Sequence, residues 1–403
     1  MVKKNKVLAS IVAATLVAGT FVGCGGTTAT SNNAKEITVW SHLKEKEITE
    51  LTKVAEKWGS EKGVKVNVVD DKGEMQAYIQ AANSSKGPDI LFGVPNDNLG
   101  TFQKAGLLSE VPSGFIDESK YTSKQVIDSV TIEGKKYAVP LAAETSALFY
   151  NKDKVSEVPK TMEEVVELGK KVGFEYDVTD LYRSYGFLAS QGSYIFKNNN
   201  GTVDSNDIGL GNEGAIKGYQ FIQDLIVKDK LMSQDITDDI AKADFQSGKS
   251  AFYISGPWDI EAFKDSGINF GIAPMPTLGG KTVSTLMGVQ TAFVSSKSPN
   301  QDLSWELMKY LMENSDDLMI KQGNRIPVSK AGIESDAFKA AGNMDVFAKQ
   351  LEVATAMPNI PEIQTTWTPV KNNIISLISG SMDSKETAKQ IVDQIKEGIK
   401  QQK

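Results

Sequence analysis

Three apolar, strand-like runs alternate with two amphipathic helices near the start of the sequence, and this order restricts the fold more than any other feature. The runs occupy residues 37–40, 64–68 and 90–92, and helical spacing of apolar residues covers 48–62 and the stretch around Ile79. A β-α-β-α-β order predicts a parallel sheet with helices on both faces. Ligands of such sheets bind at the carboxyl ends of the strands, where the loops lie.

The rest of the chain continues the α/β pattern and ends in helices. Strand-like runs are predicted at 137–141, 147–150, 250–254, 268–273 and 289–294. Helices are predicted at 161–172, 216–226, 303–312, 346–356, 370–378 and 385–399. The helix at 161–172 begins with a capping box, because Thr161 is followed three residues later by Glu164. At about 100–200 residues per domain the length suggests two or three domains, and two α/β lobes with a helical tail fit the pattern.

Composition excludes several classes of function. The formal net charge of −7 argues against a nucleic-acid binder, which needs a basic surface for phosphates. A single Cys rules out an intramolecular disulfide and a Cys-built zinc site. A single His removes most His-based catalysis and metal binding. We therefore expect a protein with no cofactor and no metal.

The first residues are typical of an export signal. Three lysines precede an apolar run at 7–22, which is shorter than the roughly 20 residues of a membrane-spanning helix. Small residues lead to Cys24, and this pattern resembles a bacterial lipobox with Phe21 in place of the usual Leu. We expect a removed signal at 1–23 and a flexible tether at 24–35, lipidated at its cysteine (palmitate being one such acyl group). An uncleaved membrane anchor and a buried structural cysteine are the alternatives.

This start predicts an extracytoplasmic protein that is lipid-anchored to the bacterial cell membrane. The tether at 24–35 has no apolar periodicity, so it is expected to be flexible. No later segment has the length and apolar character expected of a membrane span.

Three local motifs suggest ligand chemistry but fail in their context. Gly209, Gly211 and Gly214 match G-x-G-x-x-G without a preceding strand, which favours a surface turn leading into a helix. Residues 280–282 resemble the end of a P-loop whose first glycine is missing. The stretch 198–207 resembles a calcium loop without its first ligand, and we predict a solvated hairpin there.

The tryptophans divide into two groups. Trp58 and Trp305 lie within helical apolar patterns and are predicted to be core residues. Trp258 follows a Gly-Pro pair at a strand-to-helix turn, and Trp367 follows a proline-containing segment, so both are expected to face a cleft. Aromatic faces suit sugars, because a pyranose ring has apolar C–H bonds on its face and hydroxyls around its rim. Nearby carboxylates and amides can then accept hydrogen bonds from those hydroxyls.

Four short motifs give the chain, from about residue 36 to the C-terminus, a specific resemblance to bacterial maltose/maltodextrin-binding proteins. They are Gly-Pro-Asp-Ile at 87–90, Tyr-Asn-Lys-Asp at 150–153, Ser-Gly-Pro-Trp at 255–258 and Met-Pro-Asn-Ile-Pro at 357–361. These proteins are the substrate-binding subunits of ATP-driven sugar importers. The resemblance implies a two-lobed periplasmic-binding-protein fold, type II-like, in which hinged lobes have mixed sheets flanked by helices. It places one lobe at 36–142 plus 291–335 and the other at 144–286 plus 343–403.

The resemblance also implies ligand-binding residues in the second lobe and near the hinge. Glu144 corresponds to a glutamate that accepts sugar hydroxyls, and Asp180 with Tyr182 corresponds to a segment carrying a carboxyl-bearing residue and an aromatic ring. Trp258 and Trp367 match two stacking tryptophans. Two further residues are carried over from the same subsites: Met357, and Lys371, which stands where the family has an arginine.

The predicted first-lobe contacts depart from the family. The family tryptophan after the third strand is Gly93 here, and an Asp-Arg pair becomes Asp97 and Asn98. An Asp-Lys pair falls at Lys44 and Glu45 with its order reversed. Three further residues are candidates to compensate: His42, Arg183 and Tyr185. For His42 an incidental structural role is the alternative.

The implied function is non-catalytic capture of maltose or a longer maltodextrin between the lobes. Sugar that bridges both lobes shifts a hinge equilibrium toward the closed form, which docks on an ABC transporter membrane permease. The protein is expected to be a monomer. Two alternatives stay open: a binding protein for another glycan such as a galacto-oligosaccharide, and a surface glycosidase that uses Glu144 and Asp180 as its acid/base pair.

Overall fold

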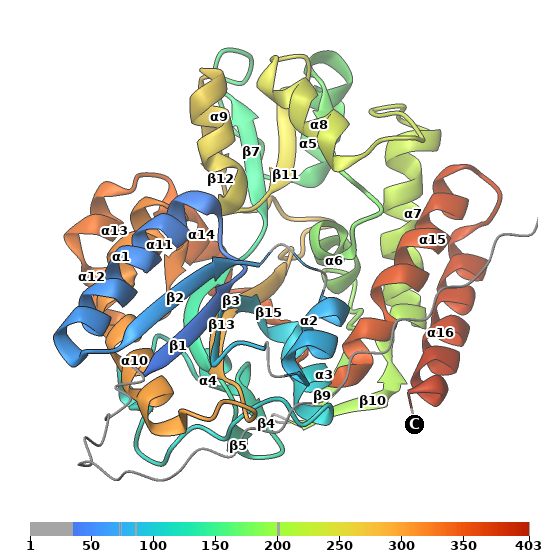
Figure 1. Ribbon diagram of the computed structural model, residues 1–403. Coiled ribbons are helices and arrows are strands. Elements are labelled where there is room, and N and C mark those ends of the chain that lie inside the picture. Colours follow the sequence, from blue (N-terminus) through green and yellow to red (C-terminus); the bar gives the residue numbers. More distant parts are fainter. Residues whose placement is uncertain (1–34, 72, 74, 85–86, 200–201, 403) are drawn as a thin grey trace, which may run out of the picture. The chain divides into compact units, whose positions relative to one another are not determined.

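Two sheets organise the part of the chain that the computed structural model describes, residues 35–402 without 72, 74, 85–86 and 200–201 (Figure 1). Lys35–Lys403 form one unit by their internal contacts. The predicted signal at 1–23, the lipidation site Cys24 and nearly all of the tether lie outside the described residues.

The first sheet has seven strands, in the order β14-β6-β13-β3-β1-β2 with β15 paired to β13. Strands β2, β1 and β3 are parallel, so the predicted β-α-β-α-β unit is confirmed. Strand β13 runs antiparallel to both β3 and β6, which makes the sheet mixed. The strands are β1 (Glu36–Ser41), β2 (Lys65–Asp70), β3 (Ile90–Pro95), β6 (Val139–Glu144), β13 (Leu286–Val294), β14 (Ile326–Pro327) and β15 (Thr355–Ala356).

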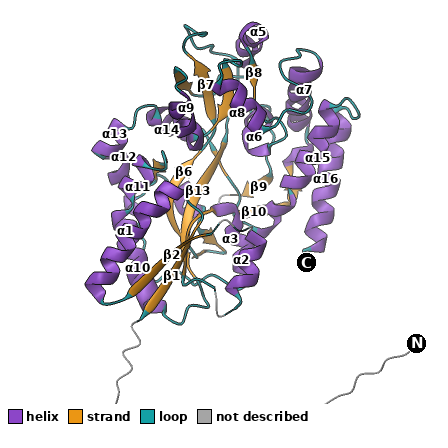
Figure 2. Ribbon diagram, turned by 45° about the horizontal axis from the view of Figure 1, so that its top comes forward, coloured by secondary structure: helices purple, strands orange, loops and turns teal. Residues whose placement is uncertain are grey.

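Helices cover both faces of this sheet, as predicted (Figures 1 and 2). On one face, α1 (Glu45–Lys62) and α10 (Gln301–Asn314) bury Leu51 and Leu311 against the strands. On the other face, α2 (Met75–Ala82) and α3 (Leu99–Lys104) pack through Tyr78 and Phe102. Two tryptophans belong to the first of these cores, as the helical patterns predicted: Trp58 and Trp305.

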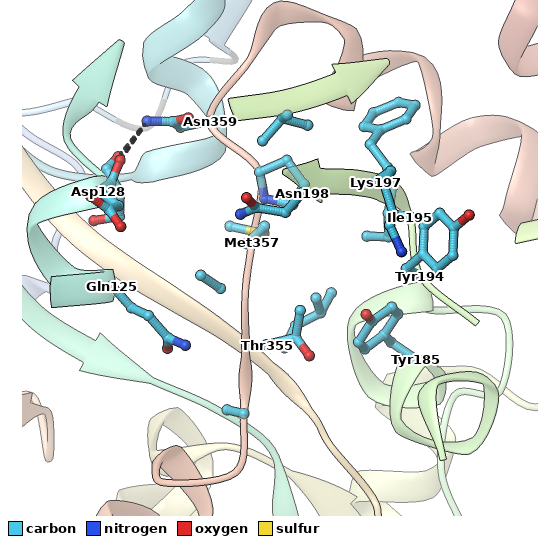
Figure 3. Close-up of a pocket in the computed structure, with 17 residues that line it drawn as sticks. Gln125, Asp128, Tyr185, Tyr194, Ile195, Lys197, Asn198, Thr355, Met357 and Asn359 are labelled. Atoms are coloured by element: carbon cyan, nitrogen blue, oxygen red, sulfur yellow. Dashed lines mark hydrogen bonds between the residues drawn. The ribbon is translucent and has the colours of Figure 1, made fainter. Parts of the chain in front are cut away.

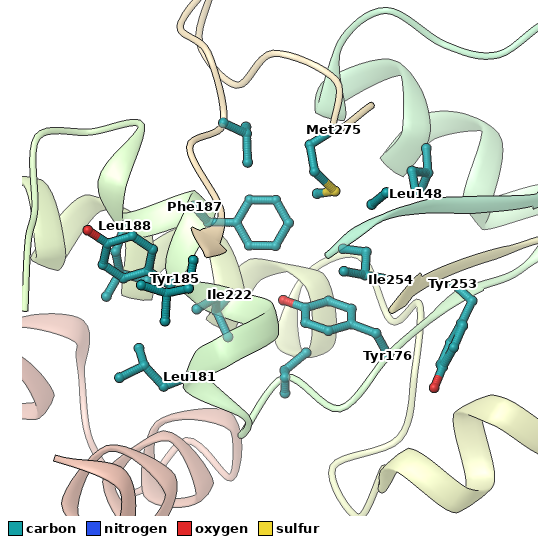
Figure 4. Close-up of a cluster of buried hydrophobic side chains, with 14 of the residues drawn as sticks. Leu148, Tyr176, Leu181, Tyr185, Phe187, Leu188, Ile222, Tyr253, Ile254 and Met275 are labelled. Atoms are coloured by element: carbon teal, nitrogen blue, oxygen red, sulfur yellow. The ribbon is translucent and has the colours of Figure 1, made fainter. Parts of the chain in front are cut away.

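The second sheet has four strands in the order β12-β7-β11-β8. Its strands are β7 (Ala147–Asn151), β8 (Phe174–Glu175), β11 (Phe252–Ser255) and β12 (Phe270–Ala273). Figure 4 shows part of its core, where Tyr176, Phe187 and Ile254 lie among other apolar side chains. The chain passes from the first sheet to the second between β6 and β7, and returns between β12 and β13.

Helices α6 and α7 pack together beside this core, and α7 lies against α15 and α16 (Figure 1). The predicted capping box of α5 is confirmed, because Thr161 Oγ1 accepts from the Glu164 N–H at 3.2 Å and Glu164 Oε2 accepts from the Thr161 N–H at 3.1 Å. The helices around the second sheet are α5 (Met162–Val172), α6 (Leu181–Ala189), α7 (Glu213–Val227), α8 (Asp238–Gln246), α9 (Ile260–Ser266), α14 (Met344–Leu351), α15 (Trp367–Ile378) and α16 (Ser384–Gln401).

Short elements complete the fold. The remaining helices are α4 (Lys124–Asp128), α11 (Asp316–Lys321), α12 (Lys330–Glu334) and α13 (Asp336–Ala340). Two hairpins are β4 (Thr131–Ile132) with β5 (Lys135–Lys136), and β9 (Phe196–Asn199) with β10 (Thr202–Ile208). The 3₁₀ turns are η1 (Asn96–Asn98), η2 (Glu118–Lys120), η3 (Gly209–Gly211), η4 (Pro257–Asp259) and η5 (Pro361–Thr365). None of the helices within the described residues combines the length and apolar character that a bilayer crossing requires.

Two local predictions need correction. The helix predicted over 346–356 ends at Leu351, because Thr355 and Ala356 pair with β13 and the Pro after Met357 disfavours helical backbone there. The turn at Gly209 does lead into a helix, but strand β10 ends directly before it, and the turn is buried rather than on the surface, since the Tyr194 ring lies against it. The hairpin predicted for 198–207 is confirmed by β9 and β10.

Candidate functional site

The carboxylate of Glu144 is the centre of the candidate site. It stands at the last residue of β6, where the chain leaves the first sheet, and 15% of its side chain is exposed. Gln290 Nε2 donates to Oε1 at 2.9 Å, and Arg325 Nη1 donates to Oε2 at 2.9 Å. A carboxylate has about four acceptor positions, so two remain for a ligand.

Tyr182 brings the start of α6 next to Glu144. Its hydroxyl donates to the Glu144 carbonyl at 3.0 Å and accepts from the Gly288 N–H at 3.2 Å. Asp180 caps the same helix, because its Oδ1 accepts from the Tyr182 N–H at 2.8 Å. These bonds join helix α6 of the second sheet to strands β6 and β13 of the first, so the structure brings Glu144, Asp180 and Tyr182 together.

The Trp258 ring completes this part of the site. It lies 5.9 Å from the Tyr182 ring in an edge-to-face arrangement. Its position depends on Gly256, because the Trp258 ring folds back over that residue and would overlap an added Cβ. The Ser-Gly-Pro-Trp motif therefore places one half-buried aromatic ring beside Glu144.

Arg183 lies behind this ring and is nearly fully buried. Its guanidinium is 6.0 Å from the centre of the Trp258 ring, donates to Asp180 Oδ2 at 2.5 Å and pairs with Asp238 at 2.7 Å. Burial raises the pKa of Asp180 above its ordinary value, and the positive charge of Arg183 opposes that rise. The Arg183 guanidinium therefore bridges the carboxylates of Asp180 and Asp238.

Asp97 and Trp367 meet at a second point of the site. Asp97 is buried in η1, and its carboxylate accepts from Gln364 Nε2 at 3.3 Å and from the Trp367 ring N–H. Burial raises the pKa of Asp97 to about 6, while these hydrogen bonds oppose the rise. Asn98, the next residue, donates to Asp97 Oδ1 at 3.0 Å.

Contacts from the first turn of α1 cross to the second sheet. The Lys44 ammonium donates to the Trp258 carbonyl, and Lys46 pairs with Glu261 in α9. Burial lowers the pKa of Lys44, and the positive charge of Arg325 lowers it further. Among the predicted site residues, Glu45 is exposed in this turn.

His42 directly follows β1, and Gly93 lies within β3. His42 Nε2 is 3.0 Å from Asp71 Oδ2, although the two atoms do not meet hydrogen-bond geometry. Gly93 adopts φ of 87° and lies against Leu43, whose side chain fills the space that a Cβ would need. The structure therefore leaves no room for a larger side chain at Gly93 unless Leu43 moves.

Two predicted site residues line a different cavity. Tyr185 and Met357 face a space of about 340 Å³ between α4 and the β9–β10 hairpin, with Thr355 between them (Figure 3). Asn359 ties this segment to the end of α4, because its amide donates to the Asp128 carbonyl at 3.1 Å. Glu144 and the tryptophans do not line this cavity, so we place the chemistry at the Glu144 site. Lys371 is exposed on α15, one turn beyond Trp367.

Four residues of the site were not anticipated from the sequence. Glu47, Gln290, Arg325 and Gln364 contact candidate binding residues from distant parts of the chain. One signal could have found Arg325: only two of the 44 basic residues in the chain are arginines, and both lie at the site.

Comparisons with known proteins show the family of the chain. The sequence matches the family described as "Bacterial extracellular solute-binding protein" over residues 45–316. It is 33% identical to the galactooligosaccharide-binding protein of Bacillus subtilis (strain 168), over 92% of this chain and 91% of that protein. It is 31% identical to a maltooligosaccharide ABC transporter solute-binding lipoprotein of Streptococcus pneumoniae (strain ATCC BAA-255 / R6), over 99% and 98%.

Solved structures show the same fold. The maltose-maltodextrin binding protein of Alicyclobacillus acidocaldarius superposes with a TM-score of 0.85 at 36% identity, covering 90% of this chain and 100% of that one. A cyclo/maltodextrin-binding protein in complex with maltotetraose gives 0.80 at 28% identity, with coverage of 92% and 98%. The predicted two-lobed periplasmic-binding-protein fold is confirmed, and the chain belongs to the family of bacterial extracellular solute-binding proteins.

Proposed function

We propose that this solute-binding protein captures maltodextrin-type oligosaccharides at the Glu144 site and delivers them to the permease of an ABC importer. The observation that carries the proposal is the grouping of Tyr182, Trp258 and Trp367 with the carboxylates of Asp97 and Glu144. The rings offer apolar faces to pyranose C–H bonds, and the carboxylates accept from hydroxyls.

The names of related proteins support a sugar ligand and leave two candidate classes. Relatives from two bacteria bind maltooligosaccharides or maltodextrin by name, and the two solved structures reported above are maltodextrin-binding proteins. The galactooligosaccharide-binding relative has 33% identity, so a galacto-oligosaccharide is the second candidate ligand.

Hinge closure is the proposed mechanism of capture. We place one lobe at 36–142 plus 291–335 and the other at 144–286 plus 343–403. The bonds of Lys44 with Trp258 and of Lys46 with Glu261 join elements of the two lobes, as expected of a closed form. A sugar held by the rings of the second lobe and the Asp97 carboxylate of the first, with Glu144 at the junction between them, would favour that form through its differential contacts.

We also propose that the protein binds sugar without cleaving it. A glycosidase needs one carboxyl group that protonates the leaving oxygen. Both oxygens of Asp180 already accept internal hydrogen bonds, from the Tyr182 N–H and from Arg183, and both oxygens of Glu144 do so as well. The two groups are therefore arranged as oriented acceptors.

The cellular setting follows from the sequence and the family. We propose that the mature protein is a monomer lipidated at Cys24 and held outside the cell membrane by the tether at 24–35, and that it presents the closed form to the permease. The family is extracellular, and two of its pneumococcal members are named lipoproteins, which supports this placement.

Calorimetric titration of the purified protein with maltotriose, maltotetraose and a galacto-oligosaccharide tests the proposal. We expect saturable binding of the maltodextrins, with no new reducing ends after prolonged incubation. Binding of the galacto-oligosaccharide alone would reassign the ligand. Release of glucose or maltose would refute the non-catalytic function.

A further inference from the structure

Both arginines of this chain lie beside the candidate site. Two of its 44 basic residues are arginines, and the other 42 are lysines. Arg183 and Arg325 are both buried, with relative exposures of 7% and 8%. Arg183 contacts Asp180 and the Trp258 ring near the second sheet. Arg325 contacts Glu144, the last residue of β6 in the first sheet.

Arg325 connects two carboxylates through all three of its nitrogens. Its Nε and Nη2 donate to the buried carboxylate of Glu47 at 2.7 and 3.1 Å, and its Nη1 donates to Glu144 Oε2 at 2.9 Å. Glu47 is held in turn, because its Oε2 accepts from the Lys44 N–H at 3.0 Å. Gly323 leaves room for this carboxylate, which an added Cβ would overlap.

Arg183 makes a similar connection on the other side. Its Nη1 donates to Asp180 Oδ2 at 2.5 Å and its Nη2 pairs with Asp238 Oδ1 at 2.7 Å. Asp180 Oδ1 is held by the N–H of Tyr182. Both oxygens of Asp180 therefore have fixed donors, while 31% of its side chain stays exposed.

A lysine could not replace these contacts. A guanidinium is a planar fork that can hold two partners at fixed angles, whereas an ammonium is a single charge on a flexible stem. Arg325 is anchored on Glu47 and holds Glu144, and Arg183 is anchored on Asp238 and holds Asp180. The two anchoring carboxylates are not candidate ligand contacts, whereas the two carboxylates that are held are.

We propose that Arg325 and Arg183 are positioning residues that orient Glu144 and Asp180 as acceptors for sugar hydroxyls, without touching the sugar themselves. This inference rests on the proposed function. Each carboxylate gives one lone pair per oxygen to its internal donors and keeps the others for the ligand. The sequence predicted a direct contact of Arg183 with the ligand, and the proposal gives this residue an indirect role instead.

Double-mutant cycles with maltotriose as the probe test the proposal. We expect Arg325→Lys to weaken maltotriose binding by about tenfold or more, since a charge-assisted hydrogen bond loses its geometry. In a Glu144→Gln background the same change should cost less than about twofold. The pair Arg183→Lys and Asp180→Asn should behave in the same way.

Cross-combinations and a core variant are the controls. Arg325→Lys and Asp180→Asn have no shared partner among the hydrogen bonds described, so their effects should add. Leu311→Ala, in the core beside α10, should lower the melting temperature and leave maltotriose affinity unchanged. A role in folding alone would give Arg325→Lys the same profile as Leu311→Ala.

Each outcome decides between roles. Losses of affinity that persist in the Glu144→Gln and Asp180→Asn backgrounds would overturn the positioning role. Arg→Gln variants replace any lysine variant that circular dichroism shows to be unfolded, and failure of both to fold also counts against it. If the unmodified protein does not bind maltotriose, the proposed function fails instead, before any variant is compared.

Discussion

The two sides of the candidate site offer a ligand different chemistry. The second-sheet side presents the rings of Tyr182 and Trp258 beside a single carboxylate, Asp180, and Trp367 packs on the same core. The first-sheet side presents the carboxylates of Asp97 and Glu144. Aromatic burial contributes affinity with little directionality, whereas fixed acceptors select how hydroxyls are arranged. Changes on the two sides should therefore affect affinity and discrimination to different degrees.

The largest effect is expected from the ring side. Trp258→Ala should weaken maltotriose binding by about 100-fold, because central aromatic anchors contribute about 2–4 kcal/mol. Trp367→Ala should weaken it as well. Titration calorimetry measures both changes, and Trp258→Phe, which keeps a ring, should retain part of the affinity. Unchanged affinity in both alanine variants would remove the rings from the site.

The next effect concerns the tight packing of Gly93 against Leu43 on the first-sheet side. Gly93→Ala should lower the free energy of unfolding by about 3 kcal/mol, because φ of 87° is strained for alanine and the Cβ overlaps Leu43. Chemical denaturation measures this loss.

Gly106→Ala is the matched control for that experiment. Gly106 also has a positive φ, of 66°, but nothing lies within 4 Å of the position of its Cβ. It should lose only about 1 kcal/mol. Equal losses in the two variants would show that Leu43 does not exclude a side chain at Gly93.

Local patterns in the sequence predicted most of the fold. Strand and helix periodicity located the parallel unit β2-β1-β3, and the capping box located α5. The end of α14 was missed, because pairing of Thr355 and Ala356 with β13 depends on a strand about 70 residues away in sequence. Helix α6 was not predicted either, although its cap, Asp180, was identified as a site residue.

The sequence could predict a residue of the candidate site only where a local motif determines the position of that residue. Trp258 lies in a motif whose glycine makes room for the ring, so its placement is local. Arg325 meets Glu47 across 278 residues and Glu144 across 181, and such pairs leave no periodic signal in the sequence. The burial of Asp97 depends in the same way on Gln364 and Trp367.

A smaller effect should come from the burial of the Asp97 carboxyl group. The pKa of Asp97 is about 6 in the folded protein against 3.8 for a free side chain, so the folded state binds the proton more tightly. Stability should therefore fall as the pH rises through 6. Between pH 5 and 7.5, Asp97→Asn should gain about 1.4 kcal/mol in free energy of unfolding relative to the unmodified protein. Denaturant titrations at several pH values measure the difference, and a constant difference would contradict the assignment.

The smallest effect should come from the ion pair of Lys46 with Glu261, which joins α1 to α9 across the two sides. The pair is largely exposed, so Lys46→Gln should weaken maltotriose binding by less than about threefold at low salt, and less still near 0.5 M salt, where screening is about threefold stronger. Lys53→Gln removes the same charge from α1 but breaks a pair within the helix, with Glu50, and should leave the affinity unchanged. Under the proposed hinge closure this pair forms as the two sides approach, so its loss should increase the dissociation rate of maltotriose more than it slows association. Equal effects of the two variants on dissociation would mean that surface charge, rather than a contact between the two sides, is responsible.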